Sequence, residues 1–398
     1  MEKLLDGAPV EWKTLGETLV RTKGTNITAG QMKELDKFGA PLKVFAGGRT
    51  VAFVNFEDIP AKDVNREPSI IVKSRGVIEF EYYDKPFSHK NEMWSYHSKN
   101  DAVDIKFVYY FLRMNEPYFQ NLGSKMQMPQ IATPDTDKFQ IPIPPLPVQA
   151  EIVRILDAFT ELTTELTTEL TTELTARKKQ YSYYRDQLLS FKEGEVEWKT
   201  LGDVAEKISS GGTPNTNVAE YWENGTIPWM SSGEVNLETV YKTEKYISEA
   251  GLKNSSAKFV PKNSIVIALA GQGKTRGKVA RIRVDLTTNQ SLASLTFNEN
   301  QINPDFVFHF LKTQYDNLRQ ISSGSGTRGG LNLQMISSYK LPIPSLAEQE
   351  RIVSILDKFD ALTSSISEGL PREIELRQKQ YEYYRELLLS FPKPDGTK

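Results

Sequence analysis

Apolar residues three and four positions apart run through two long stretches of the chain, one ending near residue 190 and the other near residue 390. This spacing is that of an α-helix with one apolar face. Between Pro147 and Gly194 neither glycine nor proline interrupts the first stretch. The second contains Gly369 and Pro371, and proline lacks the amide hydrogen that an α-helix uses, so we expect this helix to bend or break there.

Each predicted helix runs about 45 residues, or roughly 65 Å, and a helix of that length needs a partner for its apolar stripe. Two stripes of equal length in one chain are natural partners, and the segment between them allows an antiparallel return. We therefore expect an antiparallel coiled coil. The predicted pairing residues are Ile152, Ile155, Phe159, Leu162, Leu166, Tyr181 and Tyr184 in the first helix, and Ile352, Ile355, Phe359, Leu362, Ile366, Tyr381 and Tyr384 in the second.

The other parts of the chain, about residues 12–140 and 198–340, mix strand-like and helix-like patterns. Runs rich in β-branched residues and bounded by glycine turns predict strands at 69–73, 77–80 and 264–269. A short amphipathic helix is predicted in each part, at 107–113 and 306–312. The two parts therefore contain similar elements in a similar order.

Three sequence repeats indicate that one fold occurs twice. Val10-Glu-Trp-Lys-Thr-Leu-Gly16 recurs unchanged 186 residues later. Two further motifs recur 200 residues later. The first is Ile-Pro-Ile-Pro-x-Leu, with Leu341 in place of Ile141 in the second copy, followed by Gln, Ile-Val and Ile-Leu-Asp, and the other is Arg-x-Lys-Gln-Tyr-x-Tyr-Tyr-Arg. The second variable segment is thus 200 − 186 = 14 residues longer, while the helices have equal length.

This pattern predicts an α/β (α+β) protein with two similar mixed α/β domains separated by two long helices. The expected boundaries are 1–146 for the first domain, 147–191 for the first helix, 192–345 for the second domain, 346–391 for the second helix and 392–398 for a tail.

Composition excludes several kinds of chemistry. The 398 residues include no cysteine, which excludes disulfides, thiolate zinc sites and cysteine nucleophiles. The three histidines, His89, His97 and His309, are not at metal-ligand spacing, so we expect no metal site and no catalytic triad. No signal peptide or membrane-spanning run is evident, which predicts a soluble, cytoplasmic protein. The net charge of −2 does not attract nucleic acid to the chain as a whole, so any such binding must come from local clusters of basic residues.

One motif resembles a nucleotide-binding loop. The stretch Ala268-Leu-Ala-Gly-Gln-Gly-Lys-Thr275 follows a predicted strand, but its first glycine is replaced by alanine. A P-loop must also open a helix, whereas residues 276–284 alternate like a strand. We therefore do not favour nucleotide binding at this position.

The same stretch contains the densest cluster of cations, with Lys274, Arg276, Lys278, Arg281 and Arg283 within ten residues. Lysine and arginine neutralise phosphates, and arginine also reads guanine edges. Together with Gln272 and Thr275 they form a candidate DNA-binding turn, and the alternative is a solvated basic hairpin. Weaker candidates are Arg328, within the glycine-rich run 324–329, its counterpart Lys125, and the basic turns that contain Arg49, Lys73 and Arg75.

The whole arrangement resembles the specificity (S) subunit of type I restriction-modification enzymes. The resemblance rests on the two repeated helical motifs and on the run from Gly211-Gly-Thr-Pro214 to Tyr221-Trp222 and Trp229, which looks like the opening of a target recognition domain. The Thr-Thr-Glu-Leu tetrads between Glu161 and Leu174 are similar to the spacer repeats of the type IC branch. A plain solvated helix face is the alternative interpretation of these tetrads.

The resemblance implies a non-catalytic subunit that reads double-stranded DNA. Each of two target recognition domains would contact one half of a bipartite asymmetric site, and the helices would set the separation. The helices would also dock two modification subunits, which methylate adenine N6 with S-adenosylmethionine. Up to two restriction subunits would add ATP- and Mg-dependent cleavage, so no cofactor is expected in this chain.

Two other functions remain open from the residues alone. A stand-alone P-loop NTPase predicts ATP binding by the isolated chain. A coiled-coil scaffold without DNA contact predicts neither ATP binding nor salt-sensitive binding to duplex DNA.

Overall fold

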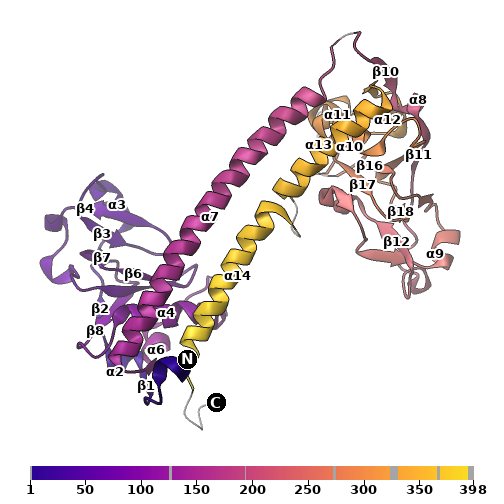
Figure 1. Cartoon of the computed structure of the whole chain (residues 1–398). Helices are drawn as coiled ribbons and strands as arrows, with labels where there is room; N and C mark the ends of the chain where they lie inside the picture. Colours follow the sequence, from indigo (N-terminus) through magenta and orange to yellow (C-terminus); the bar gives the residue numbers. More distant parts are fainter. Residues whose placement is uncertain are drawn as a thin grey trace. The chain divides into compact units, whose positions relative to one another are not determined.

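The computed structural model in Figure 1 describes residues 2–124, 128–192, 194–271, 275–322, 330–364 and 368–392. The chain divides into two compact units. Unit 1 contains Met1–Leu170 and Glu373–Lys398, and unit 2 contains Thr171–Arg372. Each unit therefore combines one variable segment with the beginning of the long helix that follows it and the last part of the other long helix.

The long helices agree with the sequence pattern. Helix α7 (Leu146–Leu188) is continuous over 43 residues. The second stretch forms two helices, α13 (Leu346–Ser364) and α14 (Gly369–Leu389). Gly369 has a φ of +80°, a left-handed backbone conformation that glycine adopts without strain. The predicted interruption at Gly369 and Pro371 is thus confirmed.

Unit 1 contains three small sheets, in the strand orders β2-β8-β5-β6, β4-β3-β7 and β1-β9. Its strands are β1 (Glu11–Thr14), β2 (Leu19–Lys23), β3 (Leu42–Phe45), β4 (Val51–Val54), β5 (Ser69–Lys73), β6 (Glu79–Tyr83), β7 (Phe87–His89), β8 (Trp94–Ser98) and β9 (Gln140–Ile143). Its short helices are α1 (Glu2–Leu5), α2 (Leu15–Thr18), α3 (Ala29–Leu35), α4 (Ile105–Met114), α5 (Glu116–Gly123) and α6 (Thr133–Asp137), with 3₁₀ turns at Phe56–Asp58 and Ala61–Asp63.

Unit 2 repeats this plan, with the strand orders β11-β19-β16-β17-β13, β14-β12-β18-β15 and β10-β20. Its strands are β10 (Glu197–Thr200), β11 (Ala205–Ser210), β12 (Ile227–Met230), β13 (Thr239–Val240), β14 (Lys245–Ile247), β15 (Phe259–Val260), β16 (Ile265–Ala268), β17 (Val279–Ile282), β18 (Leu286–Thr288), β19 (Leu292–Phe297) and β20 (Lys340–Ile343). Its short helices are α8 (Leu201–Val204), α9 (Glu249–Lys253), α10 (Pro304–Thr313), α11 (Tyr315–Ile321) and α12 (Leu333–Ser337), with 3₁₀ turns at Ala219–Tyr221 and Ser232–Leu237.

The first repeated motif forms the same local structure in both units. Its strand, β1 or β10, pairs antiparallel with the strand just before a long helix, β9 or β20. The last threonine of this strand, Thr14 or Thr200, caps a one-turn helix, and Glu17 or Asp203 completes the capping box. A Cβ at Gly16 would lie 3.3 Å from the carbonyl oxygen of Asp137, so the repeated glycine permits a close backbone approach.

The main core of each unit joins sheet, short helix and long helices. In unit 1 it includes Phe107, Ile152 and Leu156, together with Leu389 and Phe391 from the end of the chain. In unit 2 it includes Phe306, Ile352 and Leu356, together with Leu189 from the end of α7. Each variable segment therefore packs against one long helix at its beginning and against the other at its end.

Ring contacts show the antiparallel pairing within each unit. Phe159 stacks on Tyr384 with the ring centroids 5.3 Å apart, and both belong to unit 1. Phe359 stacks on Tyr184 at 5.9 Å, and both belong to unit 2. These pairs are related by the 200-residue offset, so both units use the same contact.

The middle of α7 is less covered than the apolar stripe predicts. Ile152 is buried and Tyr181 is 9% exposed, but Leu162 is 51% exposed, and Leu166, Leu170 and Leu174 are only half-buried. Leu162 is therefore not covered by another part of the described chain, and its role in pairing stays a prediction. Threonine hydroxyls hydrogen-bond to carbonyls one turn earlier in this region, as Thr168 does to Thr164 at 2.7 Å. Ile366 lies outside the described residues.

Some shorter elements differ from the sequence patterns. Strand β5 matches the prediction, whereas β6 begins at Glu79, two residues later than expected. Helices α5 and α11 were not predicted, since each directly follows another short helix with a break of a single residue, Asn115 or Gln314. Among the described residues, no helix combines the length and the apolar character needed to cross a membrane.

Candidate nucleic-acid interface

The predicted DNA-binding turns lie at equivalent places in the two units. In unit 1 the turn joins β5 to β6, and in unit 2 it joins β16 to β17, and both strand pairs are antiparallel hairpins. In unit 2 a strand, β17, follows the turn that resembles a P-loop. The amides and dipole of a helix N-terminus are therefore not available there to bind a phosphate.

A second segment of each unit is hydrogen-bonded to the flank of each of these turns. In unit 2 the amide of Leu331 donates to the carbonyl of Leu269 at 2.9 Å, next to the segment 323–329. In unit 1 the amide of Ile131 donates to the carbonyl of Ser74 at 3.0 Å, next to the segment 125–127. Ile131 and Leu331 are related by the 200-residue offset. Each unit thus brings together the flanks of two loops that the sequence marks as basic.

The candidate cations differ in their surroundings. Arg49 and Arg75 are exposed, Arg49 in the turn between β3 and β4 and Arg75 in the β5–β6 turn. Thr275, Arg276 and Lys278 are half-buried, and Lys278 Nζ donates to Asn236 Oδ1 at 2.7 Å. Four other candidates lie outside the described residues, namely Lys125, Gln272, Lys274 and Arg328.

Three cations of the sequence clusters form ion pairs within the folded unit. Lys73 is 7% exposed, and its ammonium lies 2.6 Å from Glu79 and 2.8 Å from Glu81. Arg281 is 9% exposed and pairs with Asp357 at 2.7 Å, and Arg283 binds Asp305 with both contacts at 2.7 Å. An ion pair that is held inside the fold cannot neutralise a phosphate without first being broken. We therefore do not retain these three side chains as DNA contacts.

The repeated glutamine of the helical motif holds the domain to its helix. Gln149 Oε1 accepts from the amide of Asp104 at 2.8 Å, and its Nε2 donates to the carbonyl of Pro144 at 2.7 Å. Gln349 makes the equivalent bonds to Asn303 and Pro344, both at 2.9 Å. Both glutamines are fully buried. The sequence repeat identified the two glutamines, but their hydrogen-bond partners could be seen only in the structure.

The repeated aspartate provides a second anchor. In unit 1 Asp157 accepts from the Tyr110 hydroxyl at 2.5 Å and pairs with Lys106 at 2.7 Å. In unit 2 Asp357 accepts from His309 Nε2 at 2.8 Å and pairs with Arg281. Tyr110 and His309 occupy equivalent places on α4 and α10. Sequence analysis did not identify this anchor, because the partner side chain changes from tyrosine to histidine.

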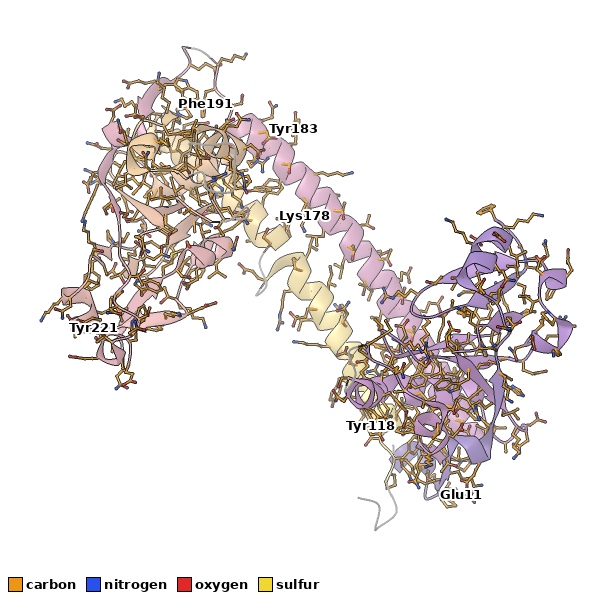
Figure 2. The ribbon with its side chains drawn as sticks, turned by 180° about the vertical axis from the view of Figure 1, so that it is seen from behind. Glu11, Tyr118, Lys178, Tyr183, Phe191 and Tyr221 are labelled. Atoms are coloured by element: carbon orange, nitrogen blue, oxygen red, sulfur yellow. The ribbon has the colours of Figure 1, made fainter. Side chains whose placement is uncertain are left out.

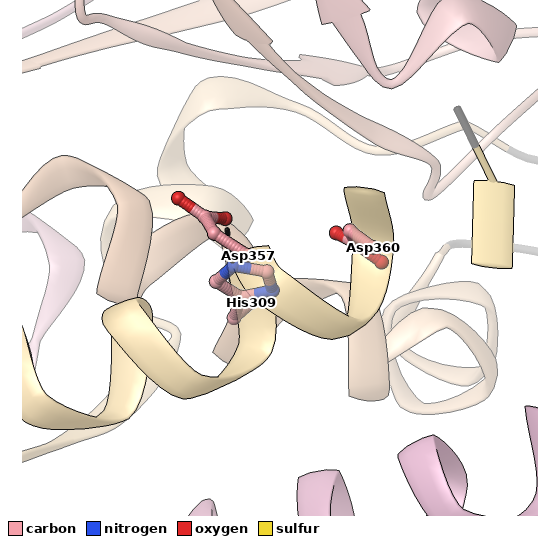
Figure 3. Close-up of side chains that lie close together, drawn as sticks. All are labelled: His309, Asp357 and Asp360. Carbon is pink, nitrogen blue, oxygen red and sulfur yellow. Dashed lines mark hydrogen bonds and ion pairs between the residues drawn. The ribbon is translucent and has the colours of Figure 1, made fainter. Parts of the chain in front are cut away.

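His309, Asp357 and Asp360 lie close together, as Figure 3 shows, with one possible ligand atom of each within 4.8 Å of the others. Arg281 already neutralises Asp357, and the equivalent residues of unit 1 are Tyr110, Asp157 and Thr160, which include only one carboxylate. Burial raises the pKa of Asp357, but hydrogen bonds from His309 and Arg281 outweigh it and lower the pKa to about 2. We interpret the cluster as an anchor of the domain and not as a metal site.

Replacing Tyr110 with phenylalanine tests the anchor in unit 1. The change removes the hydroxyl that Asp157 accepts from and should lower the free energy of unfolding of unit 1 by about 1–2 kcal/mol. Urea unfolding followed by circular dichroism measures this difference. Tyr118→Phe is the control, because Tyr118 is 52% exposed and should change stability by less than about 0.5 kcal/mol. Equal stability of the two variants would contradict the anchoring role.

Comparison with known proteins connects this architecture to a family. A family model described as the type I restriction modification DNA specificity domain matches residues 27–176 and 193–376. The type I restriction enzyme EcoR124I/EcoR124II specificity subunit of Escherichia coli is 42% identical and covers 99% of this chain and 98% of its own length. A putative type I restriction enzyme specificity subunit, S.HindORF215P of Haemophilus influenzae, is 32% identical, with 98% of both chains covered.

Solved structures show the same fold at low sequence identity. The type I restriction-modification S subunit from M. genitalium has a TM-score of 0.55 and 18% identity, with 98% of both chains covered. A chain from a study of complex assembly and conformational transition of the type I R-M system has a TM-score of 0.65 and 16% identity, with 96% of this chain and 98% of that chain covered. The repeated domains, the long helices and these similarities agree, and the chain belongs to the family of type I restriction-modification specificity subunits.

Proposed function

We propose that this chain reads a bipartite, asymmetric site on double-stranded DNA, with one half-site for each unit. The observation that carries the proposal is the duplicated loop pair, because each unit has a hairpin whose flank bonds to the flank of a second loop at the same place in its fold. Side chains from such loops can enter a groove, where cations bind phosphates and polar groups read base edges. The two loop pairs differ in sequence, which fits two different half-sites.

The proposed contacts come from residues of these loops and of one further turn. In unit 1 they are Arg49, Arg75 and Lys125, and in unit 2 they are Gln272, Thr275, Arg276, Lys278 and Arg328, together with Lys274. The proposed target recognition domains keep the boundaries 1–146 and 192–345. The side chains that hold these domains to the helices are Gln149, Gln349, Asp157 and Asp357.

The long helices would set the distance between half-sites and dock two modification subunits. These partners would supply S-adenosylmethionine and methylate adenine N6, and up to two restriction subunits would supply ATP- and Mg-dependent cleavage. This chain would then act in the cytoplasm as the non-catalytic reader. A solved structure with this fold comes from a study of complex assembly of the type I R-M system, which supports such partners.

Co-expression of the chain with its modification subunit tests this function directly. Methylome sequencing should find methylated adenine in one motif made of two different half-sites and a non-specific spacer. A single uninterrupted motif, or no methylation by a soluble complex, would contradict the proposal. ATP binding by the isolated chain would instead favour the NTPase interpretation.

Alanine at single loop cations tests the contacts themselves. Each lost phosphate contact should reduce the slope of log K against log salt by about one. We expect this reduction for Arg75→Ala in unit 1 and for Arg276→Ala in unit 2. Arg154→Ala is the matched control, because Arg154 is an exposed arginine on α7 that pairs with Glu151. If both variants have the same salt slope as the control, the two turns make no phosphate contact and are solvated hairpins.

A further inference from the structure

A third turn of each unit is hydrogen-bonded to the flank of the β5–β6 or β16–β17 turn. The third turns are residues 90–92, after β7, and residues 289–291, after β18. Ser74 Oγ donates to the carbonyl of Glu92, and the amide of Leu269 donates to the carbonyl of Ser291, both at 2.8 Å. The carbonyls of Ser74 and Leu269 also accept from the second loop of each unit. These two residues therefore connect the third turn with both loops that the proposed function uses.

Backbone contacts hold the two third turns in the same way. The amide of Lys90 donates to the carbonyl of Phe45, the last residue of β3, at 2.9 Å. The amide of Asn289 donates to the carbonyl of Met230, the last residue of β12, at 3.0 Å. The first and the third residue of each turn are thus held by equivalent bonds, so the middle residues of the two turns occupy equivalent places.

A glycine packs closely against each third turn. A Cβ at Gly24 would collide with the backbone carbonyls of His89 and Lys90, and a Cβ at Gly211 would collide with that of Thr288. The residue after each glycine donates its amide to the carbonyl of the residue just before the turn, at 2.7 Å in unit 1 and 2.9 Å in unit 2. Glycine permits this approach because it has no side chain. The glycine motif at the opening of the second variable segment therefore lies beside the third turn of unit 2.

The middle residue of both third turns carries an exposed carboxamide. This residue is Asn91 in unit 1 and Gln290 in unit 2. The residues on either side have different side chains in the two turns, namely Lys90 and Glu92 in unit 1 and Asn289 and Ser291 in unit 2. No hydrogen bond of the Asn91 side chain occurs among the described residues. The carboxamide at the middle position is thus the chemistry that the two turns share.

A threonine of the glycine motif orients the carboxamide of unit 2. Thr213 Oγ1 donates to Gln290 Oε1 at 2.6 Å, and both residues are exposed. An amide oxygen can accept two hydrogen bonds, so Gln290 keeps one acceptor site and its two amide hydrogens for a ligand. Farther along the segment that contains Thr213, Tyr221 lies at the opposite end of unit 2 from Phe191, as Figure 2 shows. This segment thus leads away from the end of α7.

We propose that Asn91 and Gln290 each read one adenine in the major groove, one in each half-site, and that Thr213 positions the Gln290 carboxamide. A carboxamide can accept from the N6 amino group of adenine and donate to N7 at the same time. The third turn is connected to the loops that carry the proposed phosphate contacts, and such contacts fix the register in which a neighbouring side chain meets a base. This inference rests on the proposed function and adds one base-reading residue to each unit.

Binding to duplexes that differ by one base pair tests the assignment in unit 2. The full chain, in complex with its modification subunit, is titrated with duplexes that carry the methylated motif and every single substitution of it. Gln290→Ala should reduce discrimination at one A·T pair roughly tenfold to a hundredfold and leave the other positions unchanged. The salt slope should not change, because a base contact neutralises no phosphate. Thr213→Val should reduce discrimination at the same pair by a smaller factor.

Gln290→Glu gives a readout that does not depend on removing the side chain. The glutamate has the size of glutamine and can still accept from Thr213. A carboxylate accepts from the N4 amino group of cytosine but has no hydrogen to donate to adenine N7. The preference at the affected position should therefore shift from adenine towards cytosine. This variant tests the assignment even if Gln290→Ala fails to fold.

Asn91→Ala tests the assignment in unit 1. It should reduce discrimination by a similar factor at one A·T pair of the other half-site. Asn300→Ala is the matched control, because Asn300 is an exposed carboxamide beyond the other end of β19. The control should keep the wild-type discrimination at every position.

Wild-type discrimination by the Gln290 or the Asn91 variants would overturn the assignment of that residue and leave bipartite reading intact. A uniform loss of affinity for all duplexes, or a lower salt slope, would also overturn it, because such a result indicates packing or a phosphate contact. A wild-type complex that methylates no bipartite motif would overturn both this inference and the proposed function.

Discussion

Insertion of one Thr-Thr-Glu-Leu tetrad after Leu170 should lengthen the non-specific spacer of the recognised site by one or two base pairs and leave both half-sites unchanged. Four residues add roughly 6 Å of α-helix, whereas one base pair occupies about 3.4 Å of the DNA axis. The inserted unit keeps the leucine spacing, and the leucines of this region are only half-buried or exposed, so folding should survive. Methylome sequencing of the variant measures the spacer directly.

Deletions in the same region test whether the length of α7 sets the length of the DNA spacer. Removing one whole tetrad should shorten the spacer by one or two base pairs. Removing only two residues rotates the following turns of α7 by about 200°, so that Leu174 would no longer continue the stripe of Leu162, Leu166 and Leu170. The two-residue deletion should therefore lose methylation, although it removes less of the chain. An unchanged spacer in active tetrad variants would refute the hypothesis that the tetrads set the spacer length.

Replacement of residues 201–339 by the corresponding segment of another specificity subunit should change one half-site and leave the other intact. The replaced segment lies between β10 and β20, so the strand pair that holds it to the helices is preserved. Gln349 and Asp357 also remain and can bind the grafted short helix. A wrong base pair costs about 1–3 kcal/mol, so with about three wrong pairs the original half-site should lose roughly a thousandfold in affinity or more.

The graft needs a suitable partner for Asp357. Grafts with tyrosine or histidine at the position of His309 should dock, because these two residues bond to the aspartate in the two units. A graft with leucine at this position is the matched control and should dock less well, since Asp357 would lose a donor. Simultaneous change of both half-sites in the methylated motif would contradict independent reading by the two units.

Much of the architecture was predictable because repeats and helical periodicity are local signals. The interrupted second helix and the duplication of the fold follow from such patterns, and the structure confirms them. The exposure of Leu162 could not be predicted, because apolar spacing shows which face of a helix is apolar but not how closely another helix approaches it. Burial is decided by tertiary contacts, which the pattern of a single segment does not contain.

The candidate site was less predictable than the fold. Charge density along the sequence marked both Lys73 and Arg75, yet the first is enclosed by Glu79 and Glu81 and the second is exposed. Lys73 ends β5 and pairs with carboxylates of β6, whereas Arg75 lies in the turn beyond the strand. Arg281 could not be distinguished from Arg276 in the same way, because its partner Asp357 lies 76 residues away in the sequence.

The completion of the unit 1 core by the end of the chain has a consequence for biosynthesis. Leu389 and Phe391 are translated about 375 residues after Leu15, the first buried residue of this core. Contacts so distant in sequence form slowly, and a nascent chain exposes the apolar surface that they will cover. While the ribosome is still translating unit 2, unit 1 therefore waits as an incomplete domain, and a premature stop before residue 373 would leave it a target for chaperones and proteases.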